Sequence, residues 1–175
     1  MRTFVRERCE HKSILRTGQA LELLAPVIVG TPKARVLDVG HGSGYLTAAF
    51  ALLGGEGTHI YGIENEPRFV ELAETNVRRA RRALLDEGRV SFFECDGWAG
   101  LPEHAPFNAI HVGAAAASVP LALVAQLAPG GCMVVPIGEQ YETQDLVRVD
   151  KSADGSVVAT PLYRVRYVPL VEPDY

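Results

Sequence analysis

Three glycines and one acidic residue are closely spaced in the segment Asp38-Val39-Gly40-His41-Gly42-Ser43-Gly44. An apolar run, residues 35–39, leads into this segment, and a helix-like stretch, residues 45–53, follows it. Glycines let a backbone approach a ligand closely, and the first turn of a helix adds N–H groups that have no partner within the helix. The segment is therefore either a plain strand-to-helix turn or the loop of a cofactor site.

The spacing of the glycines distinguishes between two classes of cofactor. The dinucleotide fingerprint G-x-G-x-x-G/A cradles a pyrophosphate. Here the third glycine comes one residue early, at Gly44, and Tyr45 stands where that fingerprint has Gly or Ala. The carboxylate of Asp38, two residues before the first glycine, disfavours a nearby anion and favours a cationic amino-acid group. The loop therefore points to S-adenosylmethionine rather than to a nicotinamide dinucleotide.

Two further acidic positions follow the next two predicted strands. Glu64 ends the predicted strand 59–64, about 20 residues after the glycine loop, where a carboxylate can accept hydrogen bonds from both ribose hydroxyls. Taken alone, Glu64 is equally an acid at a surface-facing strand end. Asp96 and Gly97 follow the third strand, where a carboxylate can accept from an adenine amino group, although Asp-Gly is also a common turn. Acidic or glycine sites after three consecutive strands together predict one S-adenosylmethionine site.

Strands alternate with helices along most of the chain. Strands are expected at 35–39, 59–64, 90–94, 107–112 and 132–137, and helices at 13–28, 45–53, 67–87 and 119–127, with Gly88 ending the third helix. The first helix is expected to kink or end near Pro26. Near the C-terminus, strands 145–149 and 157–171 are joined through Asp154-Gly155, a hairpin signal.

This order of elements predicts an α/β fold: an open Rossmann-like, mostly parallel sheet with flanking helices and a C-terminal antiparallel hairpin. A ligand is expected beyond the carboxyl ends of the strands, at the switch in strand order. The length of 175 residues predicts one domain, 1–175, with disorder expected in residues 1–12.

Composition excludes several classes of protein. A hydrophobic content of 47% and a charged content of 22% are ordinary for a globular domain, and a net charge of −4 gives no sign of a nucleic-acid or membrane partner. Cys9, Cys95 and Cys132 include no C-x-x-C pair, which argues against a disulfide framework and suits the cytoplasm. The histidines share no metal spacing, so no metal site is expected; His59 and His111 fall within strands, where pairing or partial burial is the default.

Three motifs in the second half are more specific. D-G-x-x-G begins at Asp96, A-P-F-N-A-I-H-V-G-A-A begins at Ala105, and Q-L-x-x-G-G begins at Gln126; Tyr-Val-Pro-Leu stands at 167–170. From about Ala20 to Leu170 the chain closely resembles the protein-L-isoaspartate O-methyltransferase family. The resemblance implies methyl transfer from S-adenosyl-L-methionine, giving S-adenosyl-L-homocysteine, to the free carboxylate of L-isoaspartyl or D-aspartyl residues in damaged proteins. It also implies a cytoplasmic monomer.

The same resemblance assigns parts of the cofactor to residues of this chain. The methionine end falls to Asp38, Gly40, His41, Gly42, Ser43 and Gly44, the ribose to Glu64 and Asn65, and the adenine to Cys95, Asp96 and Gly97. The family usually has Ser where this chain has His41. No catalytic residue is assigned, because a carboxylate is already ionised at neutral pH and needs no general base. The protein must mainly align and desolvate the reactants.

The N-terminal part departs from the family pattern. The family has Ile-Ser-Ala-Pro-His-Met-x-Ala before the helix that contains Ala20 to Leu24 here, and Lys12 stands in place of its Ser. Ser13, one position away, is interpreted as a helix N-cap. Val171 replaces a common Thr, and Tyr175 precedes the family's final helix. Two interpretations remain: an isoaspartyl methyltransferase whose substrate lid is lost or replaced, or a cofactor-binding module without that activity.

Two other features each allow two interpretations. The basic run 78–82, Arg-Arg-Ala-Arg-Arg, is interpreted as a solvated helix face rather than as a contact for RNA or an acidic partner. Trp98 follows Asp96-Gly97 and either packs in the core or leans over the adenine.

Overall fold

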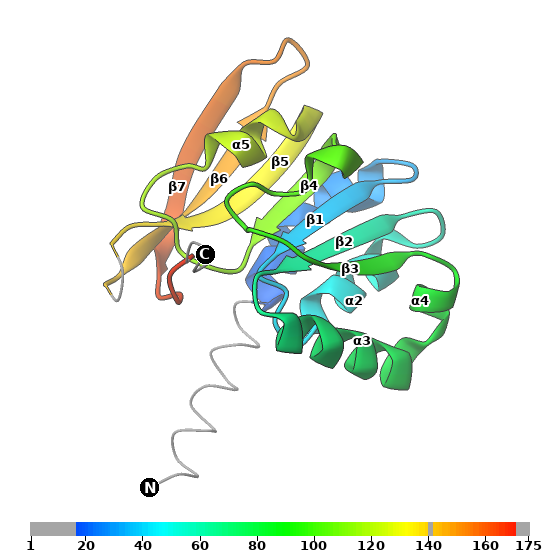
Figure 1. Ribbon diagram of the computed structural model, residues 1–175. Coiled ribbons are helices and arrows are strands. Elements are labelled where there is room, and N and C mark those ends of the chain that lie inside the picture. Colours follow the sequence, from blue (N-terminus) through cyan, green and yellow to red (C-terminus); the bar gives the residue numbers. More distant parts are fainter. Residues whose placement is uncertain (1–16, 140–141, 171–175) are drawn as a thin grey trace, which may run out of the picture.

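Seven strands form one sheet in the computed structural model, in the order β3-β2-β1-β4-β5-β6-β7 (Figure 1). The strands are β1 (Arg35–Val39), β2 (His59–Glu64), β3 (Val90–Glu94), β4 (Phe107–Val112), β5 (Leu127–Ile137), β6 (Gln144–Lys151) and β7 (Val157–Val165). Strands β1 to β5 pair in parallel, and β6 and β7 are antiparallel to their neighbours. The predicted α/β fold with a C-terminal antiparallel hairpin is confirmed.

The structure describes residues 17–139 and 142–170. The predictions made for Lys12, Ser13 and Val171, and the disorder expected in residues 1–12, lie outside these residues.

Helices cover both faces of the sheet. Residues 17–30 are helical, followed by α2 (Tyr45–Gly54), α3 (Pro67–Arg81), α4 (Ala83–Asp86), the 3₁₀ turn η1 (Pro102–His104) and α5 (Leu121–Ala125). The helical segment 17–30, α2, α3 and α4 pack on one face, whereas α5 lies on the other (Figure 1). Adjacent residues of β1 show the two-sided burial: Val36 joins the first core cluster and Leu37 the second. Burial on both faces explains why the strand is nearly all apolar.

Several boundaries differ from the sequence prediction. The helix 17–30 continues past Pro26, because the buried side chains of Leu24 and Ile28 hold both sides of that position against the core. The predicted helix 67–87 is divided into α3 and α4 at Arg82, although Arg82 itself has helical dihedral angles. The helix expected at 119–127 is only Leu121–Ala125, because Pro120 precedes it and Leu127 already pairs with Phe107 in the sheet.

The last two differences concern sheet edges. Strand β5 begins five residues earlier than the predicted Cys132, because a bulge absorbs Pro129, Gly130 and Gly131 between the pairs Phe107–Leu127 and Ala109–Cys132. Strand β7 ends at Val165 and not at the predicted 171, because the following residues leave the sheet edge and bond to the segment after β4. Among the helices of the described residues, none has the length and apolar character needed to cross a membrane.

A glycine substitution tests how tightly the turn into α2 is packed. Gly44 has φ +77°, and a Cβ built there would lie 2.9 Å from the Cβ of Ala73 and 3.1 Å from the ring of Phe92. We expect Gly44→Ala to lower the free energy of unfolding by about 2–4 kcal/mol, from a left-handed backbone plus overpacking. Denaturant unfolding measures it. Gly18→Ala, in open space on a helix, is the control and should raise stability by about 0.5–1 kcal/mol; equal effects would contradict the expectation.

Candidate cofactor cavity

A cavity of about 320 Å³ opens at the carboxyl ends of β1, β2 and β4. The strand order reverses there, since β1 lies between β2 and β4, and this is the place predicted for a ligand in an open α/β sheet. Its lining residues come from the ends of β1 and β2, the loops after β1 to β4, helix α3 and the segment 168–170: Val39, Gly40, Gly42, Ile63, Glu64, Asn65, Phe69, Gly97, Gly113, Ala114, Val168, Pro169 and Leu170.

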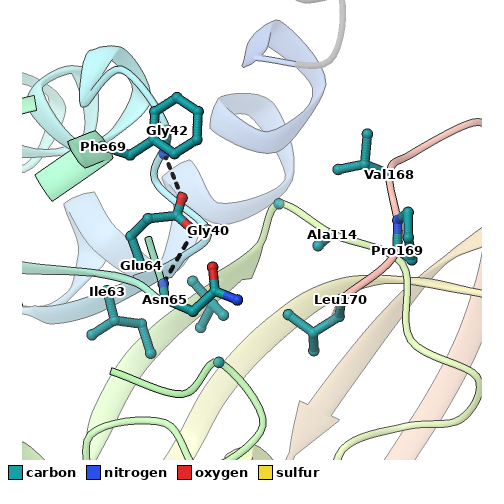
Figure 2. A pocket seen from close by; sticks show the side chains of 13 residues that line it. Gly40, Gly42, Ile63, Glu64, Asn65, Phe69, Ala114, Val168, Pro169 and Leu170 are labelled. Atoms are coloured by element: carbon teal, nitrogen blue, oxygen red, sulfur yellow. Dashed lines mark hydrogen bonds between the residues drawn. The ribbon is translucent and has the colours of Figure 1, made fainter. Parts of the chain in front are cut away.

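Glu64 is the single charged side chain among these lining residues. One carboxylate oxygen, Oε2, accepts a hydrogen bond from the Gly42 N–H at 3.2 Å, and the other, Oε1, accepts from the Asn65 N–H at 3.2 Å (Figure 2). The carboxylate thus joins the glycine loop after β1 to the end of β2. Each oxygen keeps a further lone pair for a ligand donor.

Backbone contacts hold the loop after β1 against the end of β2, and the loop after β4 against the end of β1. The Gly40 N–H donates to the Ile63 carbonyl at 2.8 Å, and the Gly113 N–H donates to the Val39 carbonyl at 2.7 Å. A Cβ at Gly113 would lie 2.8 Å from the Gly40 carbonyl oxygen, so only glycine allows this approach. The floor of the cavity is therefore main chain, which leaves space for a ligand.

Residues 168–170 form the wall opposite Glu64 (Figure 2). The Ala115 N–H donates to the Val168 carbonyl at 2.7 Å, and the Leu170 N–H donates to the Ala115 carbonyl at 2.8 Å. The buried side chain of Gln144 accepts from the Tyr167 N–H at 2.8 Å. The predicted strand 157–171 contains this Tyr-Val-Pro-Leu motif, but the structure ends the strand before it; Pro169 is the residue in the motif that signals an end of pairing.

Asp38 lies beneath the loop and does not line the cavity. It is fully buried; its Oδ2 accepts from the Thr47 hydroxyl at 2.6 Å, and its Oδ1 lies 2.8 Å from Nδ1 of His111. Burial raises the pKa of Asp38, but the hydrogen bond and charge of His111 and the Thr47 hydroxyl outweigh burial and leave that pKa below its ordinary value. The ionised carboxylate connects β1, α2 and β4.

The other residues predicted from the loop lie in different places. Gly40 and Gly42 line the cavity, whereas Ser43 and Gly44 line a separate depression beside α3. His41 is buried with its ring 4.7 Å from that of Phe92. Burial lowers the pKa of His41, against the raising effect of Asp38 and Glu64, so its imidazole is neutral at neutral pH.

The predicted adenine contacts are also divided. Gly97 lines the cavity, but Cys95 and Asp96 do not. The Cys95 N–H donates to the Glu64 carbonyl at 3.0 Å, and Asp96 Oδ1 accepts from the Trp98 N–H at 2.9 Å, which makes a local turn. Trp98 packs against the second core cluster, so the core interpretation of this residue fits the structure. Phe69, Ala114 and Leu170 line the cavity and were absent from the predicted site.

Comparison with solved structures gives the class of protein to which this fold belongs. A Plasmodium falciparum protein described as a protein-L-isoaspartate O-methyltransferase, in complex with S-adenosyl-L-homocysteine, matches with a TM-score of 0.79 and 30% identity, over 89% of this chain and 73% of that one. The fold and the position of the cavity therefore place the chain among Rossmann-like methyltransferase structures.

The sequence comparisons give the family. The family model for protein-L-isoaspartate(D-aspartate) O-methyltransferase matches residues 11–174, and the chain belongs to this family. A protein-L-isoaspartate O-methyltransferase of Triticum aestivum is 49% identical over 86% of this chain and 64% of its own length; protein-L-isoaspartate O-methyltransferase 1 of Arabidopsis thaliana is 47% identical over 79% and 60%. The chain thus spans somewhat less than two thirds of the length of these two relatives.

Stability at different pH values tests the buried Asp38. Because the folded-state pKa lies below the ordinary 3.8, its stabilisation is complete above that value and is lost as pH falls through the folded pKa. We expect Asp38→Asn to cost about 1–3 kcal/mol at about pH 7, and the difference from wild type to shrink below pH 3.8. Urea unfolding at a series of pH values measures both. The exposed Glu71→Gln is the control; a loss independent of pH would show that the carboxylate charge is not the cause.

Proposed function

We propose that this chain transfers a methyl group from S-adenosyl-L-methionine to the free carboxylate of L-isoaspartyl or D-aspartyl residues in damaged proteins. Its membership of the family supports this reaction. The main structural support for the proposal is the cavity at the strand ends, in which Glu64 is the single charged lining side chain. The lining contains no Lys or Arg. That set of side chains favours a cationic adenosyl compound over a pyrophosphate.

The lining residues fit the parts of that cofactor. The fixed carboxylate of Glu64 offers acceptors for the two ribose hydroxyls, and Asn65 adds an amide beside it. The apolar side chains of Ile63, Phe69 and Leu170 suit the faces of the adenine. A volume of about 320 Å³ is within the range of small-molecule sites. We assign Gly40, Gly42, Glu64, Asn65 and Gly97 to direct contact, and Asp38, His41, Ser43, Gly44, Cys95 and Asp96 to support of those loops.

The chemistry asks the protein for alignment rather than for acid–base catalysis. When bound, the cofactor supplies a methyl group on a positively charged sulfur, and the attacking carboxylate oxygen forms the new bond as the sulfur keeps the old bonding pair. Gly113 and Ala114 leave space for a peptide at this end of the cavity. The segment 168–170 forms one wall of the cavity, and a walled site that holds both reactants helps the oppositely charged groups to align.

We further propose a monomer in the cytoplasm. Cys95 and Cys132 are free thiols, and burial raises the pKa of Cys132 to about 12, so that thiol stays protonated and unreactive. A single peak at the monomer mass in light scattering would support the monomeric state, and a peak at the dimer mass would contradict it.

Calorimetry with S-adenosyl-L-homocysteine tests the cofactor site. Glu64→Ala removes the ribose acceptors, and we expect the dissociation constant to rise about 10–100-fold, the effect of losing charge-assisted hydrogen bonds. Glu94→Ala, a carboxylate at the end of β3 that does not line the cavity, is the matched control and should bind normally. Unchanged affinity in Glu64→Ala would overturn the assignment.

Transfer of labelled methyl groups tests the reaction. An isoaspartyl peptide should be methylated at least about 100-fold faster than the matching aspartyl peptide. An isoaspartyl residue adds one carbon to the backbone, so its free carboxylate lies in a different place from that of an aspartyl residue. Methyl transfer requires the carboxylate to be aligned with the methyl group. Background counts for both peptides, with normal cofactor binding, would favour the cofactor-binding module instead.

A further inference from the structure

A second cavity, of about 170 Å³, adjoins the cofactor cavity. The two share Gly40, Gly113 and Val168 in their linings, so the second cavity lies directly beside the first. The second cavity adds polar side chains that the first lacks, from three separate elements: Thr17, His111 and Tyr167. These residues come from the helix 17–30, β4 and the segment after β7.

His111 is fixed within this lining. The residue is 6% exposed, and its Nδ1 lies 2.8 Å from the ionised Asp38, so Nδ1–H donates to that carboxylate. Cε1 faces Gly113, at 3.5 Å from a Cβ built there. Nε2 is the ring nitrogen left for a ligand in the cavity that His111 lines.

We propose that His111 is a substrate-contacting residue: its Nε2–H donates a hydrogen bond to the methyl-accepting carboxylate of the isoaspartyl residue. This inference rests on the proposed function. A carboxylate can only accept hydrogen bonds, so the donor in this contact is the Nε2–H of His111. The ring then lies between two carboxylates, Asp38 on one side and the substrate on the other. The Tyr167 hydroxyl and the Thr17 hydroxyl are the other polar side chains of the lining.

Asp38 and Thr47 are positioning residues in this arrangement. The Thr47 hydroxyl donates to one carboxylate oxygen of Asp38 at 2.6 Å, and this leaves the other oxygen directed at His111. A carboxylate held in this way fixes both the orientation of the imidazole and the nitrogen that carries its proton. The contact with Phe50, whose ring centre lies 6.0 Å away, restricts the imidazole further.

The test separates the two ring nitrogens. In His111→Asn the amide nitrogen replaces Nδ1 and keeps the donor for Asp38, but nothing replaces Nε2. We expect the KM for an isoaspartyl peptide to rise about tenfold, equal to about 1.4 kcal/mol, with the dissociation constant of S-adenosyl-L-homocysteine within twofold of wild type. His111→Gln places its amide near Nε2 instead; it should keep peptide affinity within about threefold but unfold at a lower temperature. His59→Asn, the same change at the far end of β2, is the control and should leave KM unchanged.

Each remaining outcome overturns a stated claim. If wild type methylates the peptide and His111→Asn leaves KM unchanged, the substrate contact is wrong while the proposed function stands. If His111→Asn weakens cofactor and peptide in parallel, His111 acts only through the loop, and the substrate contact is again wrong. If His111→Asn does not fold, two other measurements decide. The wild-type complex with S-adenosyl-L-homocysteine must bind a peptide with a carboxamide in place of the α-carboxylate more weakly than the isoaspartyl peptide. Tyr167→Phe must keep this preference for the carboxylate, and failure of either result overturns the substrate contact. A wild-type chain that methylates no isoaspartyl peptide overturns the proposed function and the inference with it.

Discussion

The buried carboxylate of Asp38 is the interaction on which the arrangement of both cavities depends. An ionised group inside a sheet costs several kcal/mol unless it is paired and hydrogen-bonded. Thr47 and His111 supply those partners from α2 and β4. The pairing therefore allows an acidic residue in the central strand, and it fixes the relative position of the two strands whose loops form the cavity floor.

Two acidic residues at neighbouring strand ends have different roles because their surroundings differ. Asp38 uses both oxygens inside the fold and acts on a ligand only through the groups it orients. Glu64 sits at the rim, oriented by two backbone N–H groups, and keeps acceptor capacity toward the cavity. The sequence placed both in one cofactor site from their positions at strand ends. Only the structure distinguishes the buried support from the side chain that lines the cavity.

The two strands near the glycine loop could be predicted to the residue. Strands β1 and β2 have the expected bounds, because each apolar run ends at a glycine or an acidic residue and the local sequence alone therefore defines the end of the strand. Contacts between distant segments could not be predicted. His111 is 73 residues from Asp38, and its place in a strand gave only the expectation of pairing. The exit of residues 166–170 from the sheet depends on hydrogen bonds to Ala115, which no local pattern encodes.

Under the proposed function, the two cavities meet the needs of methyl transfer with different kinds of structure. The cofactor side consists mostly of main chain and short loops held by strand ends, so its geometry follows from the sheet itself. The polar side chains of the second cavity come from the helix 17–30, β4 and the segment after β7. These elements meet only in the folded chain, so in the proposed arrangement a change in any one of them alters the acceptor side and leaves the cofactor side in place. His111, fixed by its contact with Asp38, is the part of this proposed acceptor side that belongs to the sheet.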